Sequence, residues 1–89
     1  MPTHFTLYSR SWCHLCDDML EALRRHCQGR DISVDVIDID QDAQLLARYD
    51  ELVPVLYGRT GAAPARRLCH YFLDVPAVDA FLAGRAGED

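Results

Sequence analysis

Apolar and polar residues change period several times along the first half of the chain. Residues 4–8 (HFTLY) alternate, which predicts a short strand. Residues 13–28 repeat apolar side chains every three or four positions up to Gly29, which predicts an amphipathic helix in which Leu15 anchors the first turn to the core. Residues 32–39 (ISVDVIDI) alternate again and predict a second strand. Because a helix connects these two strands, we expect them to be parallel.

The second half of the chain predicts a helix, a hairpin and a last helix. Asp40 or Asp42 can cap a helix that continues to Tyr49. Residues 53–57 (VPVLY) and 66–73 (RRLCHYFL) read as strands joined by a turn that contains Gly and Pro, so they can pair antiparallel. The last helix begins at the possible cap Asp74, has Pro76 in its first turn and stops at Gly84.

The resulting element order, β-α-β-α-β-β-α, belongs to the α/β class. It predicts a four-stranded mixed sheet with helices on both faces. A chain of 89 residues has the length of one small domain. We assign residues 1–84 to that domain and expect residues 85–89 to be a disordered tail.

Charge and hydropathy argue against binding to nucleic acid and against a membrane span. The net charge is −5 and most basic residues are scattered, which argues against binding to nucleic acid. The longest apolar runs cover only a few residues, so we expect no membrane span and recognise no secretion signal. We therefore expect a cytoplasmic protein, in which a CxxC pair is catalytic or metal-binding more often than structural.

Cys13 and Cys16 form such a CxxC pair at the start of the first predicted helix. Disulfide exchange requires a thiolate, and a free cysteine has a pKa of about 8.5, so the anion needs stabilisation at neutral pH. The candidates are the N–H groups and dipole of the helix start, the charge of Arg10, and His14. Cys16 lies one turn beyond Cys13, close enough to resolve a mixed disulfide on it.

Alternative interpretations of these residues remain open. A structural zinc site needs four ligands, and neither Cys27, Cys69 nor any histidine repeats the spacing that such sites use, so we predict no metal. Cys27 and Cys69 fit small buried hydrophobic residues. Trp12 either forms an apolar rim for a substrate or is an exposed aromatic without a role.

Three segments together resemble a known family. The stretch YSRSWCHLC (8–16), with Arg10 three positions before the first cysteine, is followed by VIDID (36–40) and VPVLY (53–57). This pattern resembles short bacterial glutaredoxin-like proteins of the thioredoxin-like fold, and the likeness covers nearly the whole chain.

The resemblance implies a thiol-disulfide oxidoreductase. Cys13 would be the nucleophile and Cys16 the resolving thiol. The Val53-Pro54 bond would be cis and face the cysteines, and the backbone of Val53 would pair with an extended substrate. Partners would be a protein disulfide or a low-molecular-weight thiol, and we expect a monomer without a bound cofactor.

One departure from the glutaredoxin pattern concerns glutathione. Glutathione-using glutaredoxins carry a glycine pair before the last helix, where N–H groups hold a carboxylate. Residues 71–79 contain no glycine, and Pro76 removes one N–H, so glutathione is doubtful as a co-substrate. A peptide-docking module without turnover, and a 2Fe-2S cluster held by Cys13 of two chains, remain alternatives.

Overall fold

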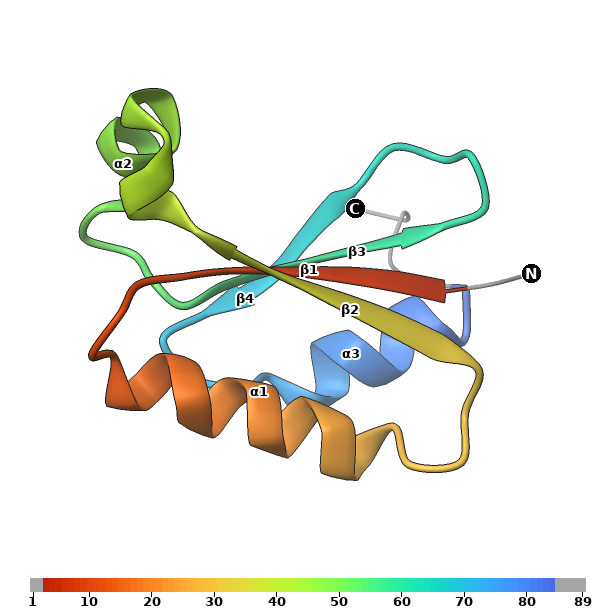
Figure 1. Ribbon diagram of the computed structural model, residues 1–89. Helices are drawn as coiled ribbons and strands as arrows, with labels where there is room; N and C mark the ends of the chain where they lie inside the picture. Colours follow the sequence, from red (N-terminus) through yellow and green to blue (C-terminus); the bar gives the residue numbers. More distant parts are fainter. Residues whose placement is uncertain (1–2, 85–89) are drawn as a thin grey trace.

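The computed structural model describes residues 3–84, and its elements follow the predicted order (Figure 1). They are β1 (Thr3–Ser9), α1 (His14–His26), β2 (Ile32–Asp38), a 3-10 turn η1 (Ile39–Gln41), α2 (Ala43–Tyr49), β3 (Val55–Thr60), β4 (Arg66–His70) and α3 (Val75–Leu82). The predicted α/β class is confirmed. The expected tail, residues 85–89, lies outside the described residues. No described helix has the length and hydropathy needed to cross a membrane.

The four strands form one mixed sheet in the order β2-β1-β3-β4. β1 runs parallel to β2 and antiparallel to β3, and β4 runs antiparallel to β3. In the register, Val55 pairs with Tyr8 on one side and with His70 on the other. The end of β1, the start of β3 and the end of β4 therefore lie side by side. The β1–α1, α2–β3 and β4–α3 connections join these strand ends and lie at one end of the sheet (Figure 1, left).

Helices cover both faces of the sheet. α1 and α3 lie together on one face, and α2 lies on the other (Figure 1). Because side chains alternate across a strand, Phe5 and Leu7 point into the core under α1 and α3, where they meet Met19 and Phe81. Tyr8 points to the opposite face and packs into the smaller core under α2.

Side chains at the helix starts supply the caps. The Asp42 carboxylate accepts the N–H groups of Gln44 and Leu45, so Asp42, rather than Asp40, begins α2. The Asp74 carboxylate accepts the N–H of Ala77 and begins α3, as predicted.

Some predicted details are wrong. β3 begins after Pro54, and β4 ends at His70 because Tyr71 takes a positive φ of 66° that a strand cannot continue through. Leu15 does not anchor the first turn of α1, since 37% of it is exposed. The buried stripe of α1 begins one residue later, at Cys16, and continues through Met19.

Candidate redox site

Cys13 and Cys16 lie at the N-terminus of α1 and are joined as a disulfide, with their Cα atoms 5.2 Å apart. Cys13 is the N-cap residue, and its Sγ accepts the N–H of Cys16 at 3.1 Å. This position brings the sulfur to the unpaired N–H groups and the positive end of the helix dipole, which favour an anion. Cys13 is half-buried, whereas Cys16 is only 3% exposed. The two sulfurs therefore differ in access to a partner.

Arg10 follows the end of β1, and two carboxylates hold its guanidinium. Its Nη2 and Nε donate to the two Asp40 carboxylate oxygens at 2.9 and 3.2 Å, and its Nη1 donates to Asp50 at 2.8 Å. The hydrogen bond with Asp40, and then the charge of that carboxylate, raise the pKa of Arg10. Arg10 thus links the segment before Cys13 to η1 and to the end of α2. Its positive charge faces two negative charges.

The turn that enters β3 is held from two directions. The Val53-Pro54 peptide bond is cis, and Pro54 is buried. The N–H of Val53 donates to the carbonyl of Tyr49 at 3.2 Å, so this backbone donor is already used within the chain. From the other side, the N–H of Tyr71 donates to the Pro54 carbonyl at 2.9 Å, and the Tyr71 hydroxyl donates to the Glu51 carbonyl.

Exposed apolar side chains gather in the connections at this end of the sheet. Trp12, immediately before Cys13, is fully exposed, and Phe72 is 68% exposed. Trp12 and Tyr71 also have positive φ angles, a conformation that costs a residue with a side chain roughly 1–2 kcal/mol. Within residues 3–84, five of the six exposed large apolar side chains lie in or beside these connections: Trp12, Leu15, Tyr71, Phe72 and Val75.

The structure places the sequence-predicted site residues on these same connections. Arg10, Trp12 and Cys13 lie between β1 and α1, His14 is exposed at the first position of α1, and the Val53-Pro54 bond immediately precedes β3.

Sequence reasoning missed two parts of this region. The carboxylate partners of Arg10 lie 30 and 40 residues away in the chain, and no local pattern identifies them. The exposed Tyr71 and Phe72 did leave a signal. Tyr71, Phe72 and Leu73 are three consecutive apolar residues, which a strand with one buried face cannot bury together.

The other two thiols are buried in the core and do not belong to the Cys13–Cys16 pair. Cys27 and Cys69 are free and buried, as predicted, and burial raises the pKa of both thiols. Among residues 3–84, no group of three or more His, Cys, Asp or Glu side chains is arranged to hold a metal ion.

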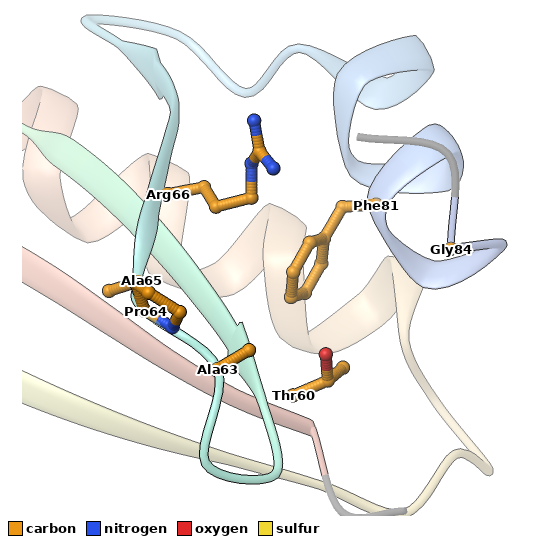
Figure 2. A pocket seen from close by; sticks show the side chains of 7 residues that line it. All are labelled: Thr60, Ala63, Pro64, Ala65, Arg66, Phe81 and Gly84. Atoms are coloured by element: carbon orange, nitrogen blue, oxygen red, sulfur yellow. The ribbon is translucent and has the colours of Figure 1, made fainter. Parts of the chain in front are cut away.

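A pocket of about 460 Å³ lies at the opposite end of β3, between the β3–β4 turn and the end of α3 (Figure 2). Its lining includes Thr60, Pro64 and Phe81. Thr60 pairs with Thr3 at the beginning of β1, whereas the cysteines follow the end of β1. This pocket is therefore remote from the redox pair.

The model of the family described as "Glutaredoxin-like domain (DUF836)" matches residues 4–83. The chain belongs to this glutaredoxin-like family. No curated protein gives a significant match. A Nitrosomonas europaea protein solved by NMR is 34% identical, with a TM-score of 0.79 over 91% of this chain and 92% of its own. A crystallised X. campestris protein is 32% identical, with a TM-score of 0.60 over 90% and 96%.

More distant structures show the fold alone. Oxidised mitochondrial thioredoxin 3 of Saccharomyces cerevisiae is 13% identical and has a TM-score of 0.67, over 92% of this chain and 77% of its own. The glutaredoxin-like chain therefore has the thioredoxin-like fold. Together with the Cys13–Cys16 pair, this fold supports a function of the redox type.

Proposed function

We propose that this glutaredoxin-like protein is a thiol-disulfide oxidoreductase that cycles Cys13 and Cys16 between dithiol and disulfide. The observation that carries the proposal is the unequal placement of the two sulfurs at one helix start. Cys13 is half-buried and has its sulfur at the N-cap, whereas Cys16 is buried one turn behind it. A two-step exchange needs an accessible attacking thiol and a more shielded resolving thiol, and the half-buried Cys13 and the buried Cys16 fit these roles.

In the first step, the Cys13 thiolate attacks one sulfur of a substrate disulfide. A bond forms between Cys13 and that sulfur, and the other substrate sulfur leaves as a thiolate that takes up a proton. In the second step, Cys16 loses its proton and attacks the Cys13 sulfur, which releases the second substrate thiol. Two electrons pass to the substrate, and an external thiol or dithiol must then reduce the Cys13–Cys16 disulfide.

Stabilisation of the Cys13 thiolate comes first from the helix start, whose N–H groups are fixed beside the sulfur. Arg10 adds positive charge nearby, although Asp40 and Asp50 offset much of it. The proposed roles of His14 as a further donor and of Trp12, Val53 and Pro54 as substrate contacts extend the same hypothesis. We also propose a monomer that acts in the cytoplasm.

The test follows reduction of a model protein disulfide with dithiothreitol as the external reductant. We expect Cys13→Ser to abolish the acceleration. Prereduced Cys16→Ser, incubated with the substrate disulfide in a separate reaction without dithiothreitol, should accumulate a mixed disulfide on Cys13, which mass spectrometry locates. Cys27→Ser is the matched control, because it removes a buried thiol outside the pair, and should retain activity. Equal rates for Cys13→Ser and the wild type would refute the proposal.

The exposed apolar side chains also favour a second candidate, a docking module without turnover. A variant with both Cys13→Ser and Cys16→Ser distinguishes the two functions. A docking module would bind its peptide partner with unchanged affinity in this double variant. For an oxidoreductase, stable capture requires the Cys13 sulfur and is lost.

A further inference from the structure

The redox end of the molecule combines apolar side chains with an excess of acids. Trp12 and Phe72 stand on two different connections at this end, each more than half exposed. Large exposed apolar side chains that gather at one end of a small protein favour an interaction surface there. Both positive-φ residues with side chains in the described chain, Trp12 and Tyr71, occur here, and strained backbone of this kind clusters at functional sites.

The charges near this surface are mostly negative. Exposed acids lie near the start of α1, beside the Pro54 turn and at the cap of α3: Asp17, Asp18, Glu51 and Asp74. Arg10 is the one arginine in the three connections, and Asp40 and Asp50 occupy its guanidinium. Most other described arginines lie elsewhere, at the last turn of α1 or on β3 and β4; Arg48, on α2, lies 5.9 Å from the centre of the Tyr49 ring.

From these observations we propose the substrate class of the site. The redox site accepts a disulfide in an extended polypeptide that carries an apolar residue and a basic residue beside the cysteine, and it discriminates against glutathione disulfide. This inference rests on the proposed oxidoreductase function. The apolar residue would pack against Trp12 or Phe72, and the basic residue would lie near Asp17 or Asp74.

Glutathione disulfide lacks the apolar and net basic character that this surface would bind. It carries four carboxylates and two ammonium groups, so its net charge is negative and the acids around the site repel it. The helix start that could hold a carboxylate, at α3, has Asp74 as its cap and Pro76 in its first turn. Asp74 already occupies the N–H of Ala77, and Pro76 has no N–H to donate.

The experiment uses prereduced protein and one equivalent of disulfide, so that no external reductant is needed. The probes are an asymmetric peptide disulfide with Leu and Lys beside the cysteine, the same peptide with Glu for Lys, and glutathione disulfide. Formation of the Cys13–Cys16 disulfide is followed by acid quenching, alkylation and mass spectrometry. We expect the Lys peptide to react about three- to tenfold faster than the Glu peptide at low salt, with the difference shrinking as salt is added.

Two variants separate the apolar and charged contributions. Phe72→Ser should slow both peptides by roughly tenfold, the size of a strong contact residue, and leave hydroxyethyl disulfide unchanged. Asp17→Lys should reduce or reverse the Lys-to-Glu rate ratio. Asp31→Lys, an identical charge change at the exposed loop before β2, should leave the ratio unaltered. Any general effect of Asp17→Lys on the Cys13 thiolate changes the rates with both peptides equally, so it cancels in the Lys-to-Glu rate ratio.

The outcomes are distinguishable from failure of the proposed function. If no disulfide oxidises the Cys13–Cys16 pair, the oxidoreductase proposal itself fails. Oxidation at equal rates by all three probes, or fastest by glutathione disulfide, would overturn the substrate class alone. A Lys-to-Glu ratio that Asp31→Lys changes as much as Asp17→Lys would also overturn it, because the preference would then reflect net charge instead of this surface.

Discussion

Gly58 lies in β3 directly against the ring of Phe81, and its replacement by alanine tests how tightly α3 packs on the sheet. A Cβ at this position would lie 2.6 Å from Phe81 Cε2, 2.7 Å from Phe81 Cζ and 3.0 Å from Leu68 Cδ1. The ring has little room to move, since Phe81 is 5% exposed and packs edge-on against Phe5 at 5.7 Å. We expect Gly58→Ala to lower the free energy of unfolding by about 1–3 kcal/mol through overpacking.

Equilibrium urea unfolding measures this loss, and thermal unfolding should show a fall in Tm of roughly 4–8 °C for each kcal/mol in a domain of this size. Phe81→Leu removes the two ring atoms that Gly58→Ala would meet. The double variant should therefore cost less than the sum of the single variants, by about 1 kcal/mol. An unchanged urea midpoint for Gly58→Ala, or strictly additive costs, would refute the steric argument. Oxidation of Cys13 and Cys16 should be unaffected in every variant that folds.

Three further predictions concern caps and titrating groups. Asp74→Ala removes the N-cap of α3 and should cost about 1 kcal/mol in urea unfolding, with Asp74→Asn as the conservative control. Burial and the hydrogen bond donated to Tyr57 raise the pKa of Tyr49 to about 12. The folded state holds this proton more tightly than the unfolded chain, so stability should fall as pH rises from about 10 towards 12, and Tyr49→Phe should flatten that fall. Arg10→Gln should slow iodoacetamide alkylation of reduced Cys13 below neutral pH, whereas Asp40→Asn should speed it; changes in the same direction would argue against a charge effect of Arg10 on the thiolate.

The fold could be predicted because its elements leave short-range patterns. The alternation around Phe5 and Leu7 and the helical spacing through Met19 depend only on which face of each element is buried. The errors occur where a single dihedral angle ends a strand or where a small rotation of a helix changes which residues are buried. The positive φ of Tyr71 ends β4 three residues early, and a shift of the buried stripe by one residue exposes Leu15.

The site was predictable only in part for a related reason. The CxxC spacing identifies the pair, since the chemistry needs both sulfurs within one helical turn. The partners of Arg10 depend instead on tertiary structure, because η1 and the end of α2 approach the end of β1 only after the sheet has formed. The apolar surface likewise requires the strand register that aligns Tyr8, Val55 and His70.

Because Cys27 and Cys69 are buried, the number of cysteines that react with a thiol label in the native protein depends on its redox state. Of the four cysteines, two are shielded in the core and two form the pair at the start of α1. A bulky thiol label applied to the native protein should therefore add nothing to the oxidised form and at most two labels to the reduced form. Unfolding exposes Cys27 and Cys69 as well, so the unfolded protein should take four labels when it is reduced and two, at Cys27 and Cys69, when it is oxidised. The positions of the labels, located by peptide mass spectrometry, therefore separate a change of redox state from a loss of structure.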